Sequence, residues 1–283
     1  MTLAFAASGT GQNGRVVVRR PIIQPHRVVA IPPEQHPWGR FPIGSWKTVR
    51  VNSETLDSEG RVSNVTWTDT KTTLIAADAT SYTLQVEVTV EIAGKRFSKL
   101  PETFKHGYQG EKPGQLVAVK HVGNAQIAIN GQAIPCEVRQ STIEIGGLKR
   151  VSNVQYCSTV WPYQMKRETT IEGAADDQRA TTVAEVVALG VQEQIAGEVQ
   201  SATHVKTTHN QPSGTKVTLE VHTLAVPGGV VSHVATETDA EGNPVRRSTL
   251  ELVAFGVTNE RSMEMAGRAG RKARKAARRM EAR

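Results

Sequence analysis

The two cysteines of this 283-residue chain are the residues whose spacing most directly predicts chemistry. If Gly146-Gly147 forms a two-residue hairpin turn, the numbers of opposite residues add up to 293, so Cys136 faces Cys157. Such a pair occupies a non-hydrogen-bonded position, where Cα atoms lie about 4.5 Å apart, within the range of a disulfide. The sequence therefore predicts a disulfide between Cys136 and Cys157, with two reduced, buried thiols as the alternative. A bridge would indicate an oxidising compartment.

Other patterns for catalysis or metal binding are weaker. The segment 9–14 matches the G-x-G-x-x-G string of dinucleotide sites, but β-prone residues follow it where a helix is required. His204 and His209 are five residues apart, which places them on opposite faces of a strand. The sequence contains no G-x-S-x-G, H-E-x-x-H or P-loop string. We predict no cofactor and no metal site, and favour a non-enzymatic protein over an enzyme whose site the fold assembles.

Positive charge is concentrated at the two ends of the chain. Residues 1–50 carry seven basic side chains and one acidic side chain, and residues 260–283 carry nine basic and three acidic ones. The chain between them carries 18 basic and 23 acidic residues, so the net charge of +7 comes from the ends. A nucleic-acid-binding surface over the whole body is therefore disfavoured.

The C-terminal segment 259–283 is predicted to be a basic helix or tail. Its apolar stripe is mostly alanine and too thin to insert deeply into a bilayer, so Coulomb attraction to an anionic surface is the favoured role. A merely solvated tail is the alternative. The candidate docking residues are Arg271, Lys272, Arg274, Lys275, Arg278 and Arg279.

Residues 1–44 contain six prolines and no sustained periodicity, which predicts an extended N-terminal arm or leader. The first eight residues form a short apolar run that closes on small residues, as a secretory signal does, although no cationic region precedes it. Export to the periplasm or beyond is the favoured location, and a cytoplasmic protein is the alternative.

Residues 45–258 are predicted to form an all-β body. Over 82–92, apolar and polar residues alternate for eleven positions, which is typical of a strand with one wet face. Turn signals recur every 8 to 16 residues, so we expect an antiparallel meander of about 12 to 14 strands. The similar segments 185–191 and 251–257 indicate weak internal repeats, with chance similarity as the alternative. An open or half barrel is favoured, and a β-sandwich or two packed sheets are the alternatives.

Three segments, the strand 82–92, the hairpin 132–157 and the stretch 162–168, together resemble the LolA-like lipoprotein-carrier proteins of the bacterial periplasm. The resemblance covers about residues 45–258. It implies an open β-barrel whose concave face binds an acyl chain or a lipidated partner. These carriers also place helices against that face, for which this body offers no segment. The expected binding residues are the apolar side of the clearest strand: Leu84, Val86, Val88 and Val90.

The favoured function is thus an exported β-sheet protein that binds an acyl chain or another apolar group. The second hypothesis is a structural or assembly protein of the cell envelope that docks on anionic surfaces through its cationic ends. The third is an enzyme with a site assembled by the fold. No pattern in the sequence indicates an oligomeric state.

Overall fold

The computed structural model describes residues 31–175 and 179–258, and these residues form one antiparallel sheet. A short 3-10 helix, η1 (Pro33–Gln35), precedes the strands. The strands are β1 (Trp46–Leu56), β2 (Val62–Ala77), β3 (Ser81–Ile92), β4 (Lys95–Ser98), β5 (Glu102–Gly107), β6 (Val117–Ile129), β7 (Gln132–Ile145), β8 (Leu148–Tyr156), β9 (Gln164–Glu172), β10 (Thr181–Ile195), β11 (Glu198–Gln211), β12 (Gly214–His222), β13 (Val230–Asp239) and β14 (Pro244–Gly256).

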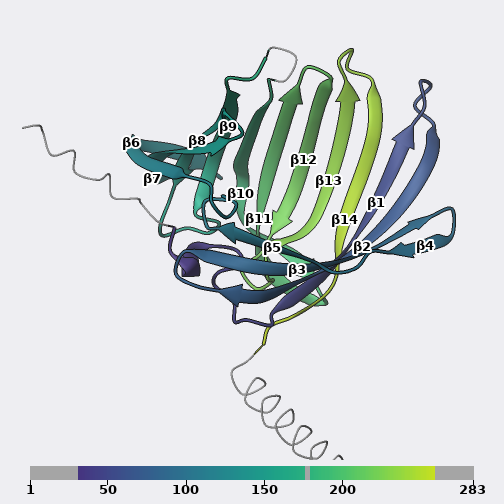
Figure 1. Ribbon diagram of the computed structural model, residues 1–283, viewed down its shortest axis with the longest axis horizontal. Coiled ribbons are helices and arrows are strands. Elements are labelled where there is room, and N and C mark those ends of the chain that lie inside the picture. Colours follow the sequence, from purple (N-terminus) through teal and green to yellow (C-terminus); the bar gives the residue numbers. More distant parts are fainter. Residues whose placement is uncertain (1–30, 176–178, 259–283) are drawn as a thin grey trace, which may run out of the picture.

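The strand order across the sheet is β4-β3-β2-β1-β14-β13-β12-β11-β10-β9-β8-β7-β6, and β5 shares the outer edge of β3 with β4. The first strand therefore pairs with the last in the middle of the sheet. Figure 1 shows that the sheet is curved, with β3 and β5 at one end and β6 to β8 at the other running across the direction of β11 to β14. The predicted all-β antiparallel meander is confirmed. The sheet is not closed into a barrel. Because all strands of this part of the chain belong to one sheet, the alternatives of a sandwich and of two packed sheets are wrong for it.

The turn between β7 and β8 has the register that the sequence predicts. Ile145 pairs with Leu148, and the pairing continues without a shift to Glu137 and Tyr156. Gly146 and Gly147 have φ values of 56° and 86°. A tight hairpin turn requires positive φ at both central residues, which glycine adopts at little cost. Two consecutive glycines are therefore sufficient to set the pairing of the whole hairpin.

One end of the sheet rolls up around a hydrophobic core. Long strands and a bulge between His121 and Gly123 let the β6–β7 hairpin turn back toward β10, where the Asn130 side chain donates a hydrogen bond to the carbonyl oxygen of Leu189 at 2.8 Å. The seven buried residues of this core are Ile129, Ile134, Cys136, Cys157, Met165, Val186 and Val205. A second, smaller buried cluster consists of Ile195, Ala202, Val226 and Val231.

Residues 31–45, which we call the strap, connect distant parts of the sheet. The carbonyl oxygen of Pro37 accepts a hydrogen bond from the backbone N–H of Gly228 at 3.0 Å, and Gln35 donates to the carbonyl oxygen of Ser158 at 3.3 Å. The ring of His36 lies 4.6 Å from that of Tyr82 on β3. One short segment thus contacts β3, the β12–β13 turn and the loop that follows β8. We call the side of the sheet against which the strap lies the inner face; it is the concave side.

Several sequence predictions fall on residues that the structure does not describe. The signal-like segment 1–8, the glycine string 9–14 and the basic tail 259–283 lie outside the described residues. Of the predicted N-terminal arm, only the part that belongs to the strap is described. Within the described residues, no helix has the length and hydropathy needed to cross a membrane.

Candidate functional site

The strap is fitted closely to the inner face. A Cβ atom on Gly228 would lie 2.8 Å from the ring of Trp38, and one on Gly39 would lie 2.6 Å from the ring of Tyr108. Both distances are shorter than carbon atoms tolerate, so these two positions require glycine. The nitrogen Nδ1 of His36 accepts hydrogen bonds from the backbone N–H groups of Trp38 and Gly39, both at 3.2 Å. Burial lowers the pKa of His36 to about 4, which keeps the ring neutral and able to accept these bonds.

Beneath the strap, four titratable side chains lie on the inner face. Glu220 and His222 are hydrogen-bonded at 2.8 Å, and His233 lies opposite Glu220 on the neighbouring strand. The Nε2 atom of His233 is buried and has no hydrogen-bond partner in the part of the chain that the structure describes. Lys47 donates to the carbonyl oxygen of Val230 at 2.9 Å. Burial lowers the pKa of Lys47 to about 8, and the nearby Glu220 counteracts part of this effect.

At the β3–β5 end, the inner face is apolar; its β3 side chains are half-buried, and two phenylalanines beside them are exposed. Phe97 on β4 lies opposite Val90, and Phe104 on β5 lies opposite Leu84, so these side chains share one face. Phe97 is 56% exposed and Phe104 is 42% exposed. We call the set of six residues the apolar region: Leu84, Val86, Val88, Val90, Phe97 and Phe104.

The apolar region belongs to the inner face because it continues the row of Tyr82. The ring of Tyr82 stacks on that of Tyr108 at 5.6 Å, and both rings contact His36 of the strap. Side chains two residues apart on a strand share a face. The four predicted residues of β3 therefore share the inner face with Tyr82, and their role in binding stays a prediction.

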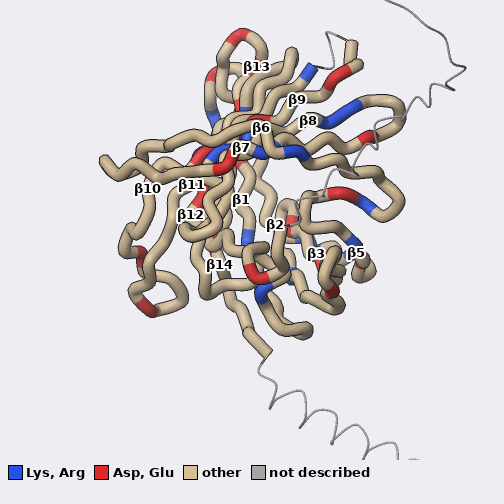
Figure 2. The backbone as a smooth tube through the Cα atoms, turned by 90° about the vertical axis from the view of Figure 1, so that its left-hand side faces the viewer, with Lys and Arg blue, Asp and Glu red and all other residues tan. Residues whose placement is uncertain are grey.

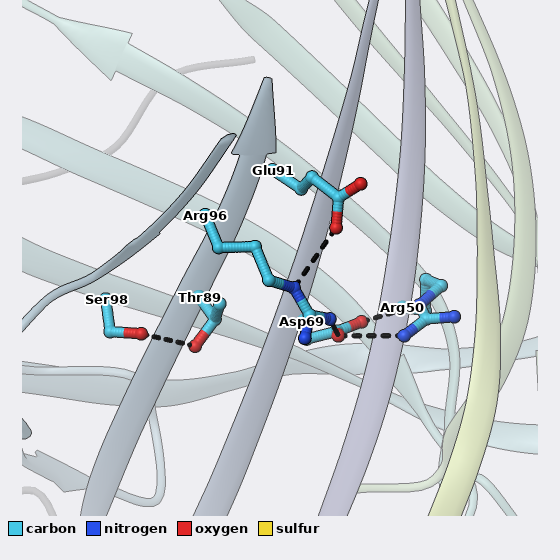
Figure 3. A network of polar contacts seen from close by, with 6 residues as sticks. All are labelled: Arg50, Asp69, Thr89, Glu91, Arg96 and Ser98. Atoms are coloured by element: carbon cyan, nitrogen blue, oxygen red, sulfur yellow. Dashed lines mark hydrogen bonds and ion pairs between the residues drawn. The ribbon is translucent and has the colours of Figure 1, made fainter. Parts of the chain in front are cut away.

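The outer face of the same strands is polar and charge-paired. Figure 3 shows Arg50 donating two hydrogen bonds to Asp69, at 2.7 and 2.9 Å, while Arg96 reaches both Asp69 and Glu91. The hydrogen bonds from Arg50 lower the pKa of the Asp69 carboxyl group. Thr89 lies in the same row of the outer face, 3.0 Å from the hydroxyl of Ser98. The alternation of wet and apolar residues predicted for this strand is confirmed.

At the opposite end of the sheet, the inner face carries three arginines. We call Arg139 on β7, Arg150 on β8 and Arg167 on β9 the arginine region. Arg139 and Arg167 lie on either side of Val154, with which both pair. Figure 2 shows Lys and Arg segments on β7 and β8, on the side of the molecule turned toward the viewer. Arg139 pairs with Glu137 at 2.8 Å and lies 3.8 Å from the centre of the Tyr156 ring.

The structure does not contain the predicted disulfide: Cys136 and Cys157 are free, buried thiols. The β7–β8 ladder ends at Tyr156, and the backbone N–H of Cys157 donates instead to the carbonyl oxygen of Tyr163 at 2.7 Å. The Cys136 thiol donates to the carbonyl oxygen of Ile134 at 3.6 Å. The register was predicted correctly, but the pairing stops one residue before the cysteines. Both cysteine side chains are part of the buried hydrophobic core, and burial raises the pKa of the Cys136 thiol.

A cleft of about 730 Å³ opens beside the two cysteines. Its lining also includes Asn124, Gln126 and Glu137. The side chains are a mixture of amides, hydroxyls, thiols and one carboxylate, and no single chemistry dominates. Among residues 31–175 and 179–258, no cluster of three or more His, Cys, Asp or Glu side chains could hold a metal ion.

The sequence pattern predicts only part of this face. Alternation indicates the four β3 residues of the apolar region but not Phe97 and Phe104, because the short strands that carry them have no pattern of their own. The three arginines were not predicted either, although a signal for them is present. The predicted register places Arg139 on the same side of its strand as Ser141 and Ile143, which are buried. The six basic tail residues lie outside the described chain, so their docking role stays a prediction.

No family model and no curated protein matches the chain. Among solved structures, a protein from Parabacteroides distasonis, provisionally classed as a lipoprotein, is 11% identical; the match covers 76% of this chain and 97% of that chain, with a TM-score of 0.35. A protein from Bacteroides fragilis, provisionally classed as exported and described as having a YmcC-like fold, is 10% identical. The match covers 76% of this chain and 98% of that chain, with a TM-score of 0.30.

Proposed function

We propose that this protein binds an acyl chain or another extended apolar group on the apolar region of its inner face. The observation that carries the proposal is the exposure of Phe97 and Phe104 beside a continuous row of aliphatic side chains on β3. An exposed apolar surface on a curved sheet marks an interaction site, because the hydrophobic effect favours its removal from water.

The neighbouring residues support an apolar but not strictly dry site. Opposite the valines of β3, the inner face of β2 presents Thr68, Thr70 and Thr72. Threonine offers a methyl group to an apolar ligand and keeps a hydroxyl for water. The paired charges of the outer face are excluded from the site because they point to the other side of the sheet.

Export of the protein is part of the same proposal. Its support is the short apolar run with small residues at positions 1–8. N-terminal sequencing of the protein from its native cells tests this point, because processing after the small residues is expected and an intact Met1 contradicts it.

The binding proposal is tested with cis-parinaric acid, a fluorescent acyl-chain probe. A Phe104→Asp variant places a charge in the apolar region, and we expect its affinity for the probe to fall at least tenfold. Val234→Asp is the matched control, since Val234 is 61% exposed and lies on the outer face. Saturable binding by the wild-type protein and by the control is expected. Equal affinities for all three proteins, or no binding by the wild type, would overturn the proposal.

A further inference from the structure

The inner face of β7, β8 and β9 has more positive charge than its own residues neutralise. Three arginines occupy inner positions of these strands, and Glu137 is the one acidic residue at an inner position of the same strands. That carboxylate pairs with Arg139. Arg167 donates a long hydrogen bond from Nη2 to the hydroxyl oxygen of Ser152, at 3.4 Å.

Two guanidinium nitrogens of this region are buried and have no hydrogen-bond partner among residues 31–175 and 179–258. They are Nη1 of Arg139 and Nε of Arg150. Arg150 does use a second nitrogen, Nη2, to donate to the carbonyl oxygen of Gly110 at 3.1 Å. A buried donor with no acceptor is destabilising, and more so when it carries charge. The pKa of Arg167 is lowered, mainly because its guanidinium group is buried and also because the positive charge of Arg150 is nearby.

A small cavity lies between two of these side chains. Its volume is about 10 Å³, and its lining includes Arg139, Arg167 and Ser141. Ile31, at the start of the strap, also lines it. A volume of about 10 Å³ accommodates one water-sized group. The cavity thus combines two guanidinium groups with room for a single small atom or ion.

We propose that the arginine region binds a small inorganic anion, either a halide ion or one oxygen of an oxyanion such as phosphate or sulfate. Guanidinium groups are the side chains best suited to such ligands because their N–H donors form a fixed, planar array. An anion in the cavity would lie beside Arg139, whose Nη1 atom lacks an acceptor among the described residues, and beside Arg167, and its negative charge would offset the repulsion between Arg167 and the nearby Arg150. The site is separate from the apolar region, which is at the other end of the sheet.

The test measures the thermal unfolding midpoint of the full chain. The starting buffer contains sodium gluconate, which is replaced stepwise by sodium chloride, sulfate or phosphate at constant ionic strength. A saturable rise in the midpoint with at least one of these anions is expected for the wild-type protein. The apparent affinity of Arg167→Gln is expected to be at least tenfold weaker. Arg247→Gln, at an exposed position of β14, is the matched control and should respond like the wild type.

The outcomes separate this proposal from the others. A rise of equal size in Arg167→Gln and wild type would be a general salt effect and would overturn the anion site. If Arg167→Gln does not fold, isothermal titration of wild-type protein and Arg167→Lys with the same anions replaces it, and the absence of saturable heat in the wild type overturns the site. Phe104→Asp is expected to keep the anion response, so failure of the acyl-chain proposal would leave this one standing.

Discussion

At one end of the sheet, β6 to β10 roll around seven buried side chains, whereas at the other end the inner face of β3 to β5 is only half-buried and two phenylalanines are exposed. The strands at the two ends share the same alternation, so the pattern does not cause the difference. The cause is strand length. β6 and β7 have 13 and 14 residues and a bulge, which allow the hairpin to bend back onto the sheet. β4 and β5 have four and six residues and cannot cover β3.

The comparison shows how one curved sheet can separate stability from binding. The rolled end buries its apolar side chains and leaves guanidinium groups beside a small cavity. The open end keeps its apolar side chains available to a ligand. Substitutions at the two ends are therefore expected to affect different properties.

The largest effect on stability is expected at the rolled end, from Met165→Ala. Met165 is 0% exposed in the core of seven residues. Removing a buried side chain of this size leaves a cavity and typically costs about 2–5 kcal/mol. Urea unfolding followed by circular dichroism measures the change. A loss below about 1 kcal/mol would mean that this core contributes little and that the two ends do not differ as described.

A second effect is expected at Lys47, beneath the strap between the two ends. Burial lowers its pKa to about 8, whereas in the unfolded chain it remains near 10.5. Below pH 8, Lys47 is protonated in both the folded and the unfolded protein, so the folded protein bears the full cost of burying its charge. As the pH rises from 8 to 10.5, the folded state loses the proton first and stability increases, by at most about 3 kcal/mol.

Unfolding free energies between pH 7 and 10.5 test this, with Lys47→Met as the comparison. The variant should lose the rise with pH. A rise that persists unchanged in Lys47→Met would assign it to another group.

The strap itself is expected to be sensitive to acid through His36. Its pKa is about 4 in the folded protein and 6.5 in the unfolded chain. As the pH falls from 6.5 to about 4, the unfolded state gains a proton that the folded state resists, so stability decreases. Protonated His36 can no longer accept hydrogen bonds from Trp38 and Gly39. Fluorescence of Trp38 and the other tryptophans should change over this range, and His36→Gln should shift or remove the change.

A smaller effect on stability is expected from the two cysteines, which also lie in the rolled end. Because both thiols are free and buried, a thiol reagent should label neither in the native protein and both after denaturation without reductant. Cys136→Ala is expected to cost about 1 kcal/mol through lost packing. Failure to label any thiol after denaturation would show an oxidised pair and contradict the structure at this position.

The smallest effect on stability is expected at the open end. Phe97→Ser should change the unfolding free energy by less than about 0.5 kcal/mol, because Phe97 is 56% exposed. The same substitution should weaken binding of cis-parinaric acid. A large loss of stability in Phe97→Ser would show that the apolar region serves the fold and would remove the distinction between the two ends.

Local patterns in the sequence were sufficient for several features of the fold. Alternation over residues 82–92 correctly predicts the two faces of β3, and two adjacent glycines correctly predict the register of β7 and β8. The turn count predicts the number of strands. These features depend on residues that are close in the sequence, where side-chain direction follows a period of two and turn geometry follows from backbone conformation.

The tertiary structure alone decided which surfaces come together. The contacts of the strap with Tyr82, Ser158 and Gly228 join residues that are distant in the sequence, and no local pattern encodes them. Two further features, the end of the ladder before Cys157 and the grouping of three arginines on one face of β7 to β9, likewise depend on how bulges and twist accumulate across many strands. Sequence by itself determined the pleated sheet and its two kinds of face; the folding of that sheet determined which end is packed and which end is open.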